Sequence, residues 1–200
     1  MLGLNVSIRN DALKLIRDAI DAGTGPGKLK FYAGPRPETG GSATTLLGTV
    51  TCSDPCAPDP AAGVLTFSAF AEDPGAPASG VCSWARFTDG NDNFVTDCSV
   101  GKKFTENGNT TADSAVITNL PSTAKIDVGM AASRPGIPEG TTVLSVDSVS
   151  QVTLSNNATA TASGVSIAFE GEGDILLNDN NISSGGPVRV SSGSITDGNA

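Results

Sequence analysis

The chain contains no histidine, one tyrosine, one tryptophan and seven phenylalanines among its 200 residues. Without histidine, the Ser-His-Asp and Cys-His mechanisms of nucleophilic catalysis are excluded, and the commonest transition-metal ligand is missing. Because aromatic side chains are so few, the hydrophobic core must come mainly from Val, Ile, Leu and Ala. We therefore expect a protein that is not an enzyme and holds no cofactor.

Basic residues and long apolar runs are also scarce. Twelve Lys and Arg against 21 Asp and Glu give a formal net charge of -9. No basic stripe is available to neutralise the phosphates of a nucleic acid. No apolar run approaches the roughly 18 residues of a membrane-spanning helix, and the first ten residues lack the apolar centre of a signal peptide. We expect neither nucleic acid nor a membrane as a partner.

Turn-forming residues are abundant, because 24 Gly and 12 Pro are accompanied by many Asn, Asp and Ser. Short runs of Val, Ile, Leu, Thr and aromatic residues lie between them, which is typical of short strands joined by tight turns. Asp89-Gly90 is a hairpin-type turn between two such runs. The expected early strands are 28–32, 45–50, 63–70, 79–88 and 91–100. The pattern predicts a mainly β fold, an antiparallel β-sandwich or jelly-roll-like domain.

One amphipathic helix is expected near the N-terminus. Asn10 and Asp11 can cap it, Gly23 can end it, and three apolar residues recur between them at helical spacing. The apolar face either packs on the protein's own sheet or mediates assembly with another subunit. The candidate assembly contacts are Leu13, Ile16 and Ile20 of this face, and Pro35, Arg36 and Pro37 of a later loop.

The amino-acid composition changes twice along the chain. Residues 113–169 are almost free of charge and rich in Thr, Ser and Ala. Five short strands are expected within them, at 115–117, 124–128, 141–146, 151–154 and 164–169, and three more are expected after them, at 175–177, 188–190 and 194–196. A polar segment with an Asn-Gly pair precedes residues 113–169, and an acidic, glycine-rich segment follows them. We therefore predict a β-sandwich domain of residues 1–105 plus 171–200, with residues 109–169 inserted as a small β domain.

Four cysteines leave three interpretations open: Cys52, Cys56, Cys82 and Cys98. Disulfides are the first, and Cys52–Cys56 with Cys82–Cys98 is the simplest pairing because each pair joins segments close in sequence. Free thiols are the second. Zinc is the third, although the spacing does not match paired Cys-x2-Cys ribbons.

Acidic residues cluster, but no cluster forms a known site. The run from Asp89 to Asn93 matches a calcium loop only in part, because the terminal Glu and the exiting helix are missing. A glycan hydrolase that uses Asp89, Asp92 and Asp97 is an alternative without paired cleft positions to support it. We therefore expect no catalytic, cofactor-binding or metal-binding residue. Trp84 is expected as a core aromatic, with a ligand-stacking platform as the alternative.

Framework motifs are spread across residues 10–101 and 174–200. They are Asn10–Leu13, Asp18–Gly23, Gly27–Leu29, Tyr32–Pro37, Thr45–Leu47, Gly80–Phe87 and Ser194–Ala200. This set resembles a group of tailed-bacteriophage virion proteins that comprises head decoration, cement and fibre-base proteins. Residues 133–169 resemble a separate β module of phage structural and fibre proteins, through Gly136–Val143 and Val152–Ser155.

The resemblance implies a structural protein on the outer surface of a phage particle. It would be a capsid decoration or cement protein that binds and stabilises the major capsid protein shell, as a homo-oligomer, trimer or dimer. The alternative is a tail-associated fibre, adaptor or receptor-binding protein that contacts the host surface. The family pattern supplies no functional residues. The four cysteines and the inserted module depart from its simpler form.

Overall fold

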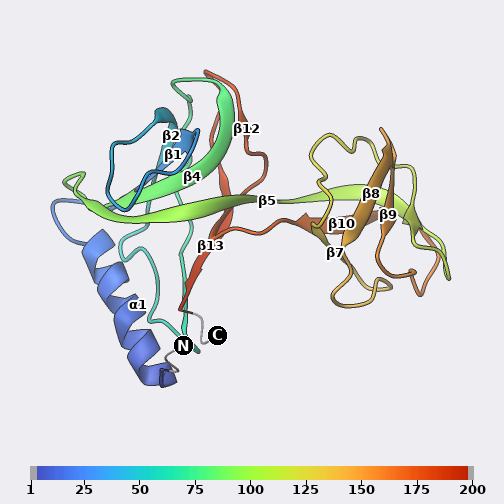
Figure 1. The fold of residues 1–200 in the computed structure, drawn as a ribbon, viewed down its shortest axis with the longest axis horizontal. Helices are drawn as coiled ribbons and strands as arrows, with labels where there is room; N and C mark the ends of the chain where they lie inside the picture. The colour runs from blue at the N-terminus through green and yellow to red at the C-terminus, as the bar shows by residue number, and fades with distance from the viewer. Residues whose placement is uncertain (1–3, 198–200) are drawn as a thin grey trace. The chain divides into compact units, whose positions relative to one another are not determined.

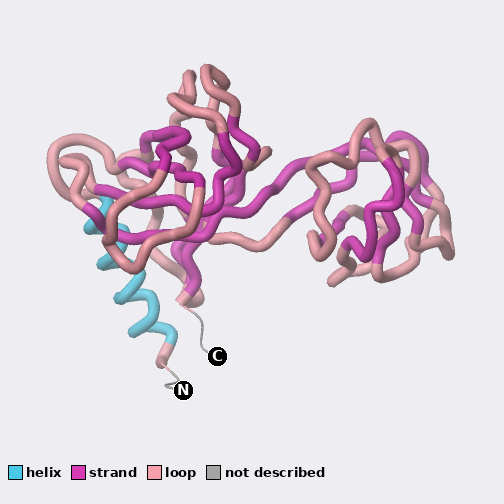
Figure 2. Tube along the Cα trace, turned by 45° about the horizontal axis from the view of Figure 1, so that its top comes forward, coloured by secondary structure: helices cyan, strands magenta, loops and turns pink. Residues whose placement is uncertain are grey.

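A computed structural model describes residues 4–197 of the chain, and strands dominate it (Figures 1 and 2). The only helix of these residues is α1 (Val6–Ile20). The strands are β1 (Lys28–Ala33), β2 (Thr45–Thr51), β3 (Val64–Thr66), β4 (Gly80–Thr88), β5 (Phe94–Thr110), β6 (Val116–Ile117), β7 (Ala131–Ser133), β8 (Val143–Ser148), β9 (Gln151–Leu154), β10 (Ala162–Glu170), β11 (Ile175–Leu177), β12 (Asn181–Ile182) and β13 (Val190–Thr196). The prediction of a mainly β, sandwich-like fold with one N-terminal helix is confirmed.

The chain divides into two compact units, which we call the first unit (Met1–Gly101 with Gly173–Ala200) and the second unit (Lys102–Glu172). Each unit has its own cluster of buried apolar side chains. Strand β5 passes through the boundary, since its early residues pair with β4 and its later residues pair with β10. The expected boundary at residue 109 falls inside this strand, because the polar run of residues 102–109 is paired and buries Phe104.

The first unit is built on strands in the order β2-β1-β4-β5-β11-β13-β3. Antiparallel pairing aligns Phe31 of β1 with Ala85 of β4, and Ala85 with Cys98 of β5. Because side chains alternate along a strand, Ala85 and Phe87 join the apolar cluster, while Trp84 and Arg86, which alternate with them, point to the other face. The sheet therefore has one apolar face and one mixed face.

Helix α1, drawn in blue in Figure 1, covers part of the apolar cluster with Leu13 and Ile20. It begins at Val6, four residues before the expected cap, because the side chain of Asn5 accepts a hydrogen bond from Ser7 N. The expected cap residue Asn10 lies inside the helix, where its side-chain oxygen accepts a hydrogen bond from the distant Gly63 N at 2.8 Å. The start predicted from Asn10 is wrong because tertiary structure gives that side chain another partner.

In the second unit, β10 pairs with both β5 and β7, and a three-stranded sheet has the order β6-β9-β8. The apolar cluster includes Ile117, Leu154, Ile167 and Phe169, all fully buried. The strand expected over residues 124–128 is wrong, because this segment forms consecutive turns with a hydrogen bond from Ile126 N to Thr123 O.

Candidate functional site

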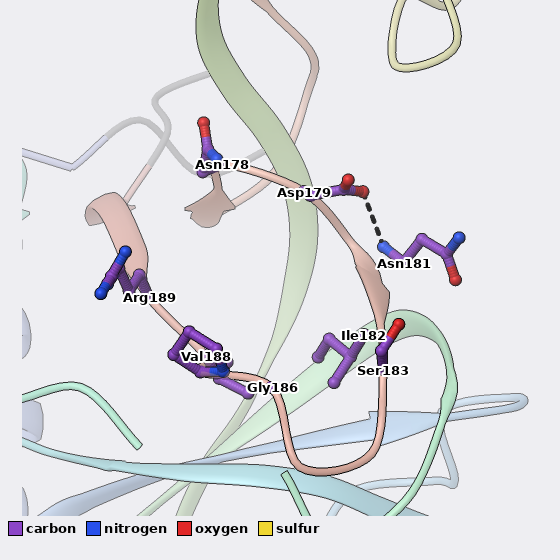
Figure 3. Close-up of a pocket in the computed structure, with 9 residues that line it drawn as sticks. Asn178, Asp179, Asn181, Ile182, Ser183, Gly186, Val188 and Arg189 are labelled. Atoms are coloured by element: carbon purple, nitrogen blue, oxygen red, sulfur yellow. Dashed lines mark hydrogen bonds between the residues drawn. The ribbon is translucent and has the colours of Figure 1, made fainter. Parts of the chain in front are cut away.

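A small hollow in the first unit lies inside the loop that runs from β11 to β13 (Figure 3). Its volume is about 260 Å³. Figure 3 shows the chain bending back on itself, so that the segment around Asp179 and the segment around Arg189 form opposite walls. The lining residues are Asn178, Asp179, Asn181, Ile182, Ser183, Gly186, Pro187, Val188 and Arg189.

Backbone hydrogen bonds hold both walls of this hollow in place. On one side, Cys82 N donates to Asn180 O at 2.7 Å, and β12 pairs with β4. On the other side, Val188 N donates to Asp73 O at 2.8 Å and Asp73 N donates to Val188 O at 3.1 Å. The hollow is therefore a fixed feature of the loop and its anchoring strands.

The two charged side chains of the hollow, Asp179 and Arg189, are already engaged with neighbours. The Asp179 side chain accepts a hydrogen bond from Asn181 N at 2.9 Å, and the Arg189 guanidinium pairs with Glu72. Asp179 is the sole carboxylate among the nine lining residues, whereas hydrolysis of a glycosidic bond uses two. The hollow offers hydrogen bonds to a small polar molecule, but no acid–base pair.

The three carboxylates considered for chemistry are each engaged locally. Asp89 accepts hydrogen bonds from Asn93 Nδ2, Asn93 N and Asn91 N at 2.8, 2.8 and 2.9 Å. The side-chain bond from Asn93 is the main reason that the pKa of Asp89 lies below its ordinary value. Asp89 therefore serves the turn between β4 and β5.

Asp92 and Asp97 are bound by cations of the same unit. The Asp92 carboxylate lies 2.8 Å from Lys30 Nζ and 3.0 Å from Lys28 Nζ, and these lysines lower its pKa. Asp97 pairs with Arg86. No group of three or more His, Cys, Asp or Glu within residues 4–197 is placed to hold a metal ion.

Trp84 is buried, as expected for a core aromatic, with 1% of its surface exposed. Its ring stacks on Tyr32 at a centroid distance of 4.4 Å, and its Nε1 donates a hydrogen bond to Thr44 Oγ1. The Arg86 guanidinium lies 5.3 Å from the Trp84 ring and 5.0 Å from the Phe94 ring. These side chains cover the mixed face of the sheet and leave no open aromatic platform at Trp84.

The four cysteines are free and buried, so the pairings Cys52–Cys56 and Cys82–Cys98 are not formed. For Cys82 and Cys98 the reason is the register in which β4 pairs with β5. Cys98 lies opposite Ala85, three residues from Cys82, which separates the two cysteines by about 10 Å along the strand. A disulfide requires Cα atoms within about 7 Å.

The first pair is also unbridged, and its thiols face the helix end. Cys56 N donates to Asp21 Oδ1 at 2.9 Å, and Cys56 Sγ lies 3.9 Å from Arg17 O. Burial, and then the nearby Asp21 carboxylate, raises the pKa of Cys52 to about 12 and raises the pKa of Cys56 as well. Both thiols are therefore protonated and inert at neutral pH.

The helix residues expected to contact other subunits are turned inward. Leu13 and Ile20 are buried in the first unit, and Ile16 packs against the same cluster. Of the two roles expected for this face, the structure has the first, packing on the protein's own sheet, and a role of the buried Leu13 and Ile20 as contacts to another subunit is wrong. Of the expected loop contacts, Pro35 and Arg36 are exposed and Pro37 is half-buried. The role of this loop as an assembly contact therefore stays a prediction.

Exposed apolar residues that the sequence analysis missed lie elsewhere. On α1, Val6, Ile8 and Leu15 are 45%, 53% and 71% exposed. In the second unit, the exposed apolar residues are Val128, Leu144, Val146 and Val149. Ile8 and Leu15 are seven residues apart, a spacing that places them on one helix face. The shared helix face of Ile8 and Leu15 can be recognised in the sequence only when the helix is taken to begin at Val6.

Comparisons with known proteins find no relative: no protein-family model, no curated protein and no solved structure matches the chain. Within residues 4–197, the helix is too short and too polar to cross a membrane.

Proposed function

We propose that the chain is a bacteriophage virion structural protein, a capsid decoration or cement protein that binds the major capsid protein on the outer surface of the particle. One observation carries the proposal. The motifs that resemble head decoration, cement and fibre-base proteins lie in residues 10–101 and 174–200, inside the first unit, and the module-like residues 133–169 lie inside the second. The two resemblances thus divide along the same boundary as the two compact units.

The way the chain uses its charged groups also supports a structural role. Asp89, Asp92 and Asp97 are each held by hydrogen bonds or cations of their own unit. Groups tied in this way stabilise turns and strand pairs, and none is left poised to transfer a proton. We therefore propose a protein that acts by binding and not by catalysis.

In this proposal the first unit docks on the capsid shell through the loop of Pro35, Arg36 and Pro37, of which Pro35 and Arg36 are exposed. A protein of this size would bury a modest area at each contact. Occupying many equivalent positions on the shell, and bridging neighbouring capsid subunits, would make several weak contacts strong together.

A second candidate function is that of a tail-associated fibre, adaptor or receptor-binding protein. It is favoured by the exposed apolar residues of the second unit, chiefly Leu144 at 57% and Val149 at 82%. Where exposed apolar residues form a contiguous patch, they mark a binding surface, and in this candidate function the partner would be a host surface molecule.

The test is to purify particles from cells that produce an epitope-tagged copy of the chain, and to locate the tag by immunogold electron microscopy. We expect the chain in washed particles, with gold on the heads. Gold on the tails alone would replace the decoration role with the tail role. A chain that stays with the cell debris would refute both.

A further inference from the structure

The loop of residues 34–44, which connects β1 to β2, lies across the mixed face of the sheet in the first unit, and we call it the strap. It reaches over β4, where Gly41 O accepts a hydrogen bond from Arg86 Nη2 at 3.1 Å. It also reaches β5, because a Cβ atom added to Gly40 would be 3.5 Å from the ring of Phe94. The strap therefore crosses the sheet from its β1–β2 side to β5.

None of the residues of the strap is itself buried. Pro37 and Gly41 are half-buried, and the other residues of the strap are exposed. The rings beneath it are covered, since Trp84 is 1% exposed and Tyr32 is 6% exposed. Trp84 Nε1 donates a hydrogen bond to Thr44 Oγ1 at 3.3 Å. Segments with few buried apolar contacts are the ones that open locally, so the strap has the properties of such a segment.

We propose that the strap opens as a unit while the sheet beneath it stays folded, and that it controls access to the stacked rings of Tyr32 and Trp84. The glycine at its start, Gly34, has a φ of 86°, and Gly40 in its middle has a φ of 71°. Glycine changes its backbone angles at little steric cost, so both positions can serve as hinges. In the closed form the rings are covered, and in the open form they face solvent.

Opening breaks few contacts and leaves the sheet intact. It breaks the hydrogen bond from Arg86 to Gly41 and those that Thr44 makes with Trp84 and Ala33. The pairing of β4 with β1 and with β5 does not involve the strap. We therefore expect a minor open form, between about 0.1% and 10% of the molecules.

The strap makes binding at Trp84 conditional. A partner that stacks on Trp84 would bind the open form alone, so the open fraction would lower its apparent affinity. Pro35 and Arg36 of the strap are exposed, and a partner that holds them in the open position would uncover the rings. This inference rests on the contacts of the strap and does not depend on the proposed function.

Hydrogen exchange of the Trp84 indole tests the opening, because the chain has a single tryptophan and its indole N–H gives a separate NMR signal. We expect a protection factor between about 10 and 1,000, which corresponds to the open fraction. It should depend little on urea below the unfolding transition, since opening exposes little surface. An indole as protected as the slowest backbone N–H groups of β4, or one without protection, would overturn the proposal.

Two glycine substitutions separate opening of the strap from unfolding of the whole unit. Gly40 and Gly185, which lies in the loop before β13, have φ values of 71° and 79°, where the β-branched Val is strained. Opening of the strap relieves this strain in Gly40→Val but not in Gly185→Val. We expect Gly40→Val to speed indole exchange at least about ten-fold, and Gly185→Val to leave it within about two-fold.

Trp84 emission checks that both variants are folded. Equal acceleration in Gly40→Val and Gly185→Val would show that the indole exchanges through unfolding of the whole unit. That result, or unchanged exchange in Gly40→Val, would overturn the proposal.

Discussion

Arg86 and Asp97 face each other across β4 and β5 and form a two-point ion pair, with Arg86 Nε 2.6 Å from Asp97 Oδ1 and Arg86 Nη2 2.9 Å from Asp97 Oδ2. Only 11% of the arginine side chain and 6% of the aspartate side chain are exposed. Arg86 Nη2 also donates to Gly41 O at 3.1 Å. The pair thus ties two central strands to the loop that covers Trp84.

Replacing Asp97 with Asn is expected to destabilise the first unit by about 3 kcal/mol, because it leaves the buried Arg86 charge without a counter-charge. Urea unfolding followed by Trp84 fluorescence measures this, since the single tryptophan reports on the first unit.

The matched control is Asp92→Asn, which weakens pairs with Lys28 and Lys30 at a half-exposed carboxylate. Asn also tolerates the positive φ of 67° at this position. The expected cost is below about 1 kcal/mol. Equal losses in the two variants would contradict the distinction between a buried and an exposed pair.

Replacing residues 102–172 with a two-residue Asn-Gly turn is expected to leave the first unit folded. The chain leaves the first unit after Gly101 and re-enters it at Gly173. These two residues lie side by side, since a Cβ atom added to Gly173 would be only 2.4 Å from Gly101 N. Cooperative urea unfolding and a blue-shifted Trp84 emission are the expected readouts. A six-residue Gly-Ser connection serves as a relaxed control. If neither variant unfolds cooperatively, the two units depend on each other for folding.

The thiols of the native protein are expected to resist alkylation. Burial raises the pKa of Cys82 and of Cys98 to about 12, so almost no thiolate exists at pH 8. Treatment with iodoacetamide at pH 8 should leave the folded protein unmodified, and unfolding in urea without a reductant should expose four reactive thiols. Mass spectrometry counts the adducts. Unmodified cysteines in the unfolded, unreduced protein would show that disulfides form after all.

Stability is expected to be flat between about pH 5 and 8 and to fall in acid, because no histidine titrates in that interval. The folded-state pKa values of Asp89 and Asp92 lie below the ordinary 3.8. A lowered folded-state pKa stabilises the fold above the unfolded value, and this contribution is lost as pH falls through the folded value. The decline should therefore begin near pH 4.

The pH prediction is checked by urea unfolding, with Trp84 fluorescence, at intervals between pH 8 and pH 2. Asp89→Asn removes one of the titrating groups and should make the acid decline shallower. A fold that becomes more stable below pH 4 would contradict the assignment of these carboxylates.

Local patterns in the sequence were sufficient for most strands. Gln151–Leu154 and Ile175–Leu177 are strands with the predicted bounds, because short apolar runs between turn residues specify an extended backbone. The segment 63–70 was less predictable. It continues to alternate apolar and polar residues, but β3 ends at Thr66, where pairing with β13 stops. Strand length thus depends on the partner strand.

The candidate site was not visible in the sequence. The hollow between Asn178 and Arg189 depends on hydrogen bonds to residues near Asp73 and Cys82, about a hundred positions earlier in the chain. The exposed pair Ile8 and Leu15 of α1 was missed for a different reason, since the helix start was placed at Asn10 and Ile8 was left outside it. No local rule shows that Asn10 bonds to Gly63.

The sequence by itself determined the mainly β class, the single N-terminal helix and the turn at Asp89-Gly90, because alternation, helical spacing and turn chemistry act over a few residues. Only the tertiary structure decided that Leu13 and Ile20 are buried while Leu15 is exposed, and that Cys98 lies opposite Ala85. These outcomes depend on strand register and on contacts between distant segments, where the gain from burial and pairing outweighs local preference.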